Sequence, residues 1–187
     1  MSVFPLFYLA PIRYYADYLN HLPNVVFEIH EHFIKQSYRT RCEIYAANGK
    51  LPLIIPVHKP FGNKTPMKDI RISYMENWQK NHWKSIESAY RTSPFFDYYE
   101  HLFIPFYEKK FEYLTDFNLE LHQTVCKLLQ IPSKTGFTTE YQKQVANDYR
   151  NYYSPKKAPN AISPYPQVFA EKHGFIHNLS IIDLLFN

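Results

Sequence analysis

Two histidines lie within one short polar segment of the sequence, residues 29–42, which reads IHEHFIKQSYRTRC. His30 and His32 are two residues apart, so on a strand they would share one side and could ligate a metal ion. No third ligand follows at metal-binding spacing, and we therefore favour a hydrogen-bonded pair at the rim of a cleft, with no metal site. Both histidines are candidates for proton transfer.

Three cations and several neutral hydrogen-bond donors follow in the same segment. Lys35, Arg39 and Arg41 supply the positive charge, and Gln36 and Tyr38 lie between them. Arginine binds phosphate and carboxylate groups through two parallel hydrogen bonds. These residues therefore predict a site for a small anionic ligand, such as a nucleotide sugar or an acyl donor. The alternative is a solvated face that binds no ligand.

A second candidate pair lies further along the chain, where His82 and Ser85 are three residues apart and would be neighbours on a helix. His82 could act as a general base and Ser85 as its nucleophile, but no carboxylate is evident that could orient the histidine. We favour a histidine at the core boundary, hydrogen-bonded to a carbonyl. Cys42 and Cys126 form no CxxC pair, which indicates reduced thiols in a cytoplasmic protein and, for Cys42, packing.

The sequence lacks the common motifs for cofactors, metals and nucleotides: a glycine-rich phosphate loop, GxSxG, HExxH and zinc-finger spacing. With only 4 glycines, an anion site here has to use side chains or a helix N-terminus. We expect no cofactor. The net charge of +4 is spread along the chain, which does not indicate nucleic-acid binding. No apolar run approaches the roughly 20 residues of a transmembrane helix, so we expect no membrane insertion.

The start of the chain predicts a strand, a helix and a second strand. Residues 3–9 (VFPLFYL) read as a buried strand, residues 25–29 (VVFEI) are rich in β-branched and aromatic residues, and the stretch after Pro11 has the length of a short helix. This order is typical of a parallel βαβ unit. The polar segment 29–42 would then follow the second strand, at the edge where open α/β sheets bind ligands.

The next part of the chain predicts a hairpin. CEIYA and LPLIIPV flank a turn at Asn48-Gly49, and the two prolines of the second arm indicate an edge strand. Residues 68–74 alternate as a half-buried strand does. The fold class is therefore α/β, with a mixed sheet that opens with a βαβ unit and carries residues 25–29 near its middle. We expect a single domain over residues 1–187.

Three aromatic-rich amphipathic helices are predicted next, and they would cover the sheet as one layer. Asn77 is a reasonable N-cap for the first helix, and Pro105 predicts a break or kink in the second. Residues 147–167 are rich in proline and predict a long loop, and residues 178–187 predict a final helix. The apolar faces predict mostly buried positions for Trp78, Ile86, Phe95, Phe106, Phe117, Leu121 and Leu128.

Three segments of the sequence carry a resemblance to a known family. They are KQSYRTRCEIYAANGKLPLIIPV (35–57), WQKNHWKSIESAYRTSPFF (78–96) and NLSIIDLLFN (178–187), and they are similar to the WbqC-like proteins of bacteria. The resemblance covers nearly the whole chain. It implies a bacterial protein associated with surface polysaccharide such as O-antigen. It brings no established catalytic residue, and Tyr8 to Pro11 stand where many members have a His-Gln-Pro-like stretch.

The resemblance and the polar segment together predict a cytoplasmic enzyme that modifies an activated sugar by acyl or aminoacyl transfer. The three cations would hold the phosphates of the donor, and one of the three histidines would transfer a proton. The alternative is a non-catalytic binding or assembly protein whose aromatic surface docks a biosynthetic partner. A large exposed aromatic patch without a deep basic pocket would favour this alternative.

Overall fold

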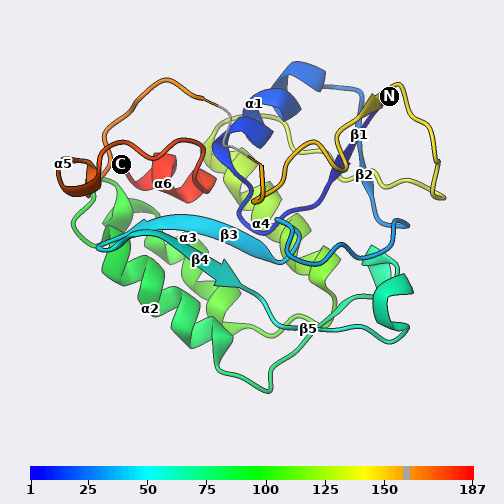
Figure 1. Cartoon of the computed structure of the whole chain (residues 1–187), viewed down its shortest axis with the longest axis horizontal. Coiled ribbons are helices and arrows are strands. Elements are labelled where there is room, and N and C mark those ends of the chain that lie inside the picture. The colour runs from blue at the N-terminus through cyan, green and yellow to red at the C-terminus, as the bar shows by residue number, and fades with distance from the viewer. Residues whose placement is uncertain (158–160) are drawn as a thin grey trace.

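The first two strands and the first helix form the expected βαβ unit in the computed structural model, which describes residues 1–157 and 161–187 (Figure 1). Strands β1 (Ser2–Pro5) and β2 (Val25–Glu28) pair in parallel, and helix α1 (Ile12–His21) connects them. The α/β class and the parallel opening are thus confirmed.

Strand β1 lies in the middle of the parallel sheet. Strand β7 (Asn147–Asp148) pairs with its other side, which gives the order β2-β1-β7. Beyond β1, strand β2 makes one isolated bridge, between Phe27 and Phe137. The expectation that residues 25–29 lie near the middle is corrected here, because a strand of two polar residues has no alternating pattern in the sequence.

The expected hairpin consists of β3 (Arg41–Ala46) and β4 (Gly49–Ile54), paired antiparallel. Gly49 has a φ of 98°, a backbone conformation that glycine adopts at little cost. Strand β4 pairs only with β3 among the strands of the described chain, as expected of an edge strand. Two short strands, β5 (Val57–His58) and β6 (Arg71–Ile72), form a further pair. The strands are therefore divided among three small sheets.

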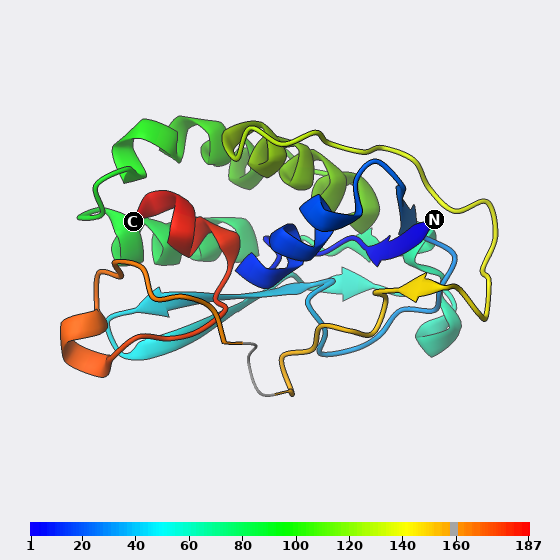
Figure 2. The same cartoon turned by 90° about the horizontal axis from the view of Figure 1, so that it is seen from above.

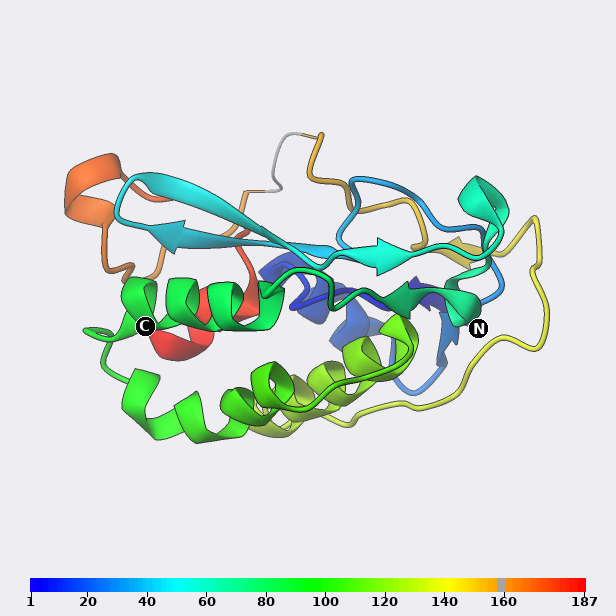
Figure 3. The same cartoon turned by 90° about the horizontal axis from the view of Figure 1, so that it is seen from below.

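The three expected helices are α2 (Trp78–Tyr90), α3 (Phe96–Glu108) and α4 (Leu114–Leu128). Figures 2 and 3 show them together on one side of the β3–β4 hairpin. Pro105 does not break α3, which continues to Glu108. Proline removes only its own N–H from the helical ladder, and its carbonyl still accepts a hydrogen bond from the backbone of Lys109.

Aromatic rings fill the space between the helices and the strands. The Phe117 side chain is fully buried, and its ring packs edge-on against Trp78, Phe106 and Phe111. Of the residues expected to be buried, Trp78, Ile86, Phe106, Phe117 and Leu121 are buried. Leu128 is only partly buried. Phe95 is 48% exposed, because it precedes the first helical residue of α3 and leaves the apolar face.

The last part of the chain returns to the core. After β7, residues 149–157 and 161–169 contain no regular element, and the expected loop 147–167 includes residues 158–160, which lie outside the described residues. Helices α5 (Ala170–His173) and α6 (Ile181–Phe186) follow. The buried Asp183 carboxylate accepts hydrogen bonds from Tyr90, Tyr165 and Gln167. None of the described helices has the length and apolar character needed to cross a membrane.

Candidate functional site

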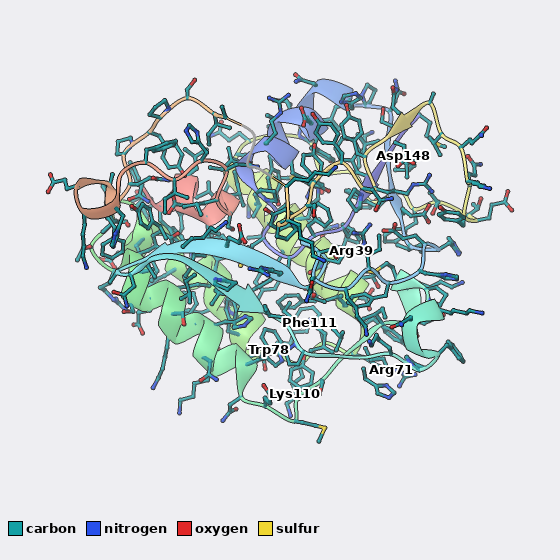
Figure 4. The ribbon with its side chains drawn as sticks, viewed as in Figure 1. Arg39, Arg71, Trp78, Lys110, Phe111 and Asp148 are labelled. Atoms are coloured by element: carbon teal, nitrogen blue, oxygen red, sulfur yellow. The ribbon has the colours of Figure 1, made fainter. Side chains whose placement is uncertain are left out.

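Polar side chains gather where the three parallel strands end. The carboxyl ends of β1, β2 and β7 lie at one edge, because the strands run in the same direction. Residues 29–39 leave β2 at this edge, and residues 149–157 leave β7. Open α/β sheets bind ligands there. In Figure 4, Asp148 and Arg39 lie above Phe111 and Trp78 of the aromatic core.

Arg150 is a buried cation that joins the ends of β2 and β7. Its guanidinium donates to Asp148 from Nε at 2.9 Å and from Nη2 at 2.6 Å, and to Glu28 from Nη1 at 3.1 Å. Glu28 is buried with it. Hydrogen bonds from Arg150 lower the pKa of the Asp148 carboxyl. A buried charge is tolerated only with such partners, so this network fixes the geometry of the edge.

Arg39 forms a second buried pair next to the first. Its side chain is almost fully buried, and both Nε and Nη2 donate to one carboxylate oxygen of Glu31, with 2.8 Å between Nε and Oε1. Nη2 also donates to the Arg150 carbonyl, which connects the two networks. The guanidinium lies over the ring of Phe7 at 5.6 Å. Burial raises the pKa of the Glu31 carboxyl, and the positive charge of Arg39 opposes this rise.

His30 is held by the same network. Its backbone N–H donates to Glu28 at 2.7 Å, and its ring Nε2 lies 3.1 Å from the Thr138 carbonyl. The Thr138 hydroxyl donates to Glu28 as well. A carbonyl can only accept a hydrogen bond, so Nε2 carries a proton, and in the neutral form of the imidazole Nδ1 is then the acceptor. This orientation by a fixed partner is typical of a general base.

His30 and His32 line the first of two neighbouring cavities, which we call the histidine cavity. Its volume is about 330 Å³, and His32 is exposed to solvent.

The histidine cavity is bounded on its other sides by the segment that follows β2 and by the segments that flank β7. Its remaining lining residues are Glu31, Ile34, Tyr141 and Asn151. No group of three or more His, Cys, Asp or Glu side chains in the described part of the chain is placed to hold a metal ion. The cavity therefore offers proton-transfer groups and an aromatic wall.

The second cavity, which we call the lysine cavity, has a volume of about 210 Å³. Its cationic lining residues are Lys35, Arg39, Lys156 and Lys157, and no carboxylate is among the described residues that line it. It shares Ile34 and Asn151 with the histidine cavity, so the two adjoin. Such a concentration of positive charge suits an anionic ligand.

The predicted ligand-binding residues divide between this cavity and other places. Lys35, Gln36 and Arg39 line the lysine cavity. Tyr38 is buried with its ring 5.8 Å from that of Phe7, and it lines neither of the two cavities. Arg41 also lines neither cavity, and its Nη2 pairs with Glu43 at 3.3 Å.

His82 lies in the aromatic core, away from both cavities. Its Nδ1 is 3.0 Å from the Tyr8 hydroxyl, and burial lowers the pKa of His82 to about 4. The Ser85 hydroxyl donates to the Asn81 carbonyl. His82 is thus a buried histidine, as favoured above, with a tyrosine hydroxyl as its partner. Burial also raises the pKa of the Cys42 thiol, which disfavours the reactive thiolate.

Sequence reasoning missed the part of the site that comes from the second half of the chain. Tyr141, Asn151, Lys156 and Lys157 reach the cavities from the segment around β7. The Lys156-Lys157 pair in a proline-rich loop was a usable signal. The pairing of β7 with β1 was not, since nothing in the sequence brings residues 147–148 beside the start of the chain.

A third cavity, of about 360 Å³, lies between the β3–β4 turn and α2. Its polar lining includes Lys50, Lys84, Ser85 and Ser88. None of the residues of the buried charge network lines it. We therefore regard the adjoining pair of cavities at the sheet edge as the better candidate site.

Comparisons with known proteins agree with the resemblance in the sequence. No curated protein and no solved structure matched the chain. The model of the WbqC-like protein family matches residues 8–161, which include β2, the hairpin, helices α2 to α4 and both cavities. The chain therefore belongs to the WbqC-like protein family.

Proposed function

We propose that this protein is an enzyme that modifies an activated sugar by acyl or aminoacyl transfer in the assembly of bacterial surface polysaccharide such as O-antigen. One observation carries the proposal: an oriented histidine lines a cavity that adjoins a cationic cavity. Such a pair of cavities has room for a reacting group beside a bound anion. Both cysteines are free and buried, which supports a cytoplasmic setting.

The lysine cavity holds the anionic part of the donor in this proposal. Lys35, Lys156 and Lys157 supply flexible point charges, while Arg39 is held in place by Glu31. Glu31 compensates the charge of Arg39, and no carboxylate among the described lining residues pairs with the three lysines, so their charge is available to an anion. Binding the phosphates here positions the donor with its reactive group toward the histidine cavity.

His30 acts as the general base. Its Nδ1 takes the proton from the acceptor hydroxyl or amine as that group forms a bond to the acyl carbon. The bond from the acyl carbon to the leaving group then breaks, the leaving group keeps the electron pair, and Nδ1 returns the proton to it. The Thr138 carbonyl keeps the ring oriented through both steps. His32 lines the same cavity and is the second candidate for proton transfer.

The second candidate function is a non-catalytic protein that docks a biosynthetic partner through aromatic side chains. Phe95 and Tyr98 are exposed at the start of α3, and the ring of Tyr99 lies close to both. This patch supports partner docking. The adjoining histidine and lysine cavities favour catalysis over docking alone, because docking requires neither an oriented histidine nor a cationic cavity.

A transfer assay tests the proposal. The purified protein is incubated with nucleotide sugars and with acyl or aminoacyl donors, and modified sugar is detected by mass spectrometry. We expect His30→Ala to lower the rate by about 10²- to 10⁴-fold, the usual contribution of a general base. Ser85→Ala is the matched control and should keep the rate. A rate that His30→Ala leaves unchanged would exclude His30 as the base.

A further inference from the structure

Tyr141 presents an aromatic face at the wall of the histidine cavity. Its side chain is 53% exposed and lines that cavity. The guanidinium of Arg150 lies over the ring, 4.8 Å from its centroid. The ring therefore has a cation on one face, and the exposed remainder is available for contact with a ligand.

The Arg150 guanidinium that lies over the Tyr141 ring is held in place by hydrogen bonds. Arg150 is 2% exposed and donates hydrogen bonds to Glu28, to Asp148 and to the Gln142 carbonyl. Gln142 directly follows Tyr141, so the same guanidinium holds both the backbone and the ring of this segment. A ring that is already ordered loses little conformational freedom when a flat group stacks on it.

The lysine cavity adjoins this aromatic face through Ile34 and Asn151, which line both cavities. Arg39 lines the lysine cavity, and its Nη1 has no hydrogen-bond partner among the described residues. A flat aromatic surface and a cationic cavity thus lie side by side. This arrangement matches a ligand with a planar ring at one end and phosphates at the other.

We infer that the ligand of this site is a nucleoside diphosphate whose base stacks on Tyr141 and whose phosphates occupy the lysine cavity. The inference rests on the proposed function, in which the lysine cavity binds an anion. Tyr141 then favours nucleotides over simple phosphates, because every base has a π-face that stacks on an aromatic ring. Nucleotide sugars and coenzyme-A-type acyl donors both contain a nucleoside diphosphate, so either class of donor fits this site.

Calorimetric titration tests the inference with four probes: UDP, CDP, ADP and inorganic diphosphate. For Tyr141→Ala we expect affinity for a nucleoside diphosphate to fall about 5- to 150-fold, the range that loss of one base–aromatic stack produces. Tyr141→Phe keeps the ring and should keep the affinity. Tyr152→Ala is the matched control, since Tyr152 is an exposed tyrosine of the same region that lines neither cavity. Inorganic diphosphate should bind all of these variants equally.

The outcomes separate this inference from the proposed function. If inorganic diphosphate binds and the nucleoside diphosphates bind no more tightly, the inference that a base stacks on Tyr141 is wrong, and the proposed anion site in the lysine cavity is retained. If no probe binds, both are wrong. A preference for UDP or CDP indicates a nucleotide-sugar ligand, and a preference for ADP indicates a coenzyme-A-type ligand. Circular dichroism of each variant excludes loss of fold as the cause.

Discussion

Histidines occur in two contrasting regions of this protein, the charged edge of the parallel sheet and the aromatic core. At the edge, His30 lines a cavity, and the buried charges of Arg39 and Arg150 are matched by carboxylates. In the core, His82 and His122 are enclosed by aromatic rings, and burial lowers their pKa values to about 4 and about 3. The buried arginines at the edge are paired with carboxylates, whereas burial in the core favours the neutral form of His82 and His122.

This difference shows why residue type alone is a poor guide to function. The Nε2 atom of His122 lies 3.3 Å from the Cys126 sulfur, so the residue types and the distance match those of a catalytic Cys–His dyad. Both side chains are buried, and burial raises the pKa of Cys126 to about 12. A thiol and an imidazole that are both neutral cannot supply a thiolate nucleophile. Access to a cavity therefore separates His30 from the histidines of the core.

The largest effect is expected from truncating the core. Phe117→Ala should lower the free energy of unfolding by about 3 to 5 kcal/mol, because it removes a fully buried ring and leaves a cavity. Phe95→Ala is the matched control and should cost much less, since Phe95 is 48% exposed. Denaturant melts of the two variants measure the difference. Equal losses would contradict the assignment of Phe117 to the core.

A somewhat smaller loss in the free energy of unfolding is expected when the pH is lowered. Burial holds the folded-state pKa of His82 at about 4, against 6.5 for an unperturbed histidine, so the unfolded chain binds more protons between these two pH values. Stability is therefore complete above about pH 6.5 and is lost as the pH falls toward 4. His82 alone accounts for up to about 3 kcal/mol of this loss.

The measurement is the free energy of unfolding of the wild type and of His82→Gln across this pH range. The carboxylates titrate in both proteins, so only the difference between the two curves reports on His82. We expect the variant to depend less steeply on pH, by about one proton. Parallel curves would show that His82 titrates normally and is not enclosed by the core.

The local pattern of the sequence predicted most of the fold. The βαβ opening, the hairpin around Asn48-Gly49 and helices α2 to α4 each depend on periodicity and turn residues within a short segment. The division into three sheets was missed, because pairing between distant strands leaves no local signal. The central place of β1 depends on β7, which has only two residues.

The candidate site was predicted only in part, because some of its residues follow a local pattern and others come from distant segments of the chain. The position after β2 correctly directed attention to His30, Lys35 and Arg39, because the ends of parallel strands meet at one edge. The partners of Arg39 could not be deduced, since they come from Glu31 and from the Arg150 carbonyl, more than a hundred residues away in the second case. Arg41 is an arginine of the same segment as Arg39, but it pairs with Glu43 and does not line the lysine cavity.

The smallest effect concerns the anion site at the charged edge. Inorganic diphosphate at about a hundredfold excess over its dissociation constant should stabilise the native state by about 2.7 kcal/mol. For a chain of this size the melting temperature should rise by about 5 to 10 °C. We expect the double variant Lys35→Ala, Lys156→Ala to lose this shift, because both side chains line the lysine cavity.

Arg41→Ala is the matched control for this last measurement. Arg41 belongs to the same basic segment of the sequence as Lys35, but it pairs with Glu43 and does not line the lysine cavity. A general electrostatic field would make Arg41 and the lysines similarly important, because it depends on charge and little on position. With a localised site, only the lysines are needed for the rise in melting temperature. Retention of the shift in Arg41→Ala, together with its loss in the lysine double variant, therefore identifies a localised anion site, whereas equal losses identify a diffuse basic surface.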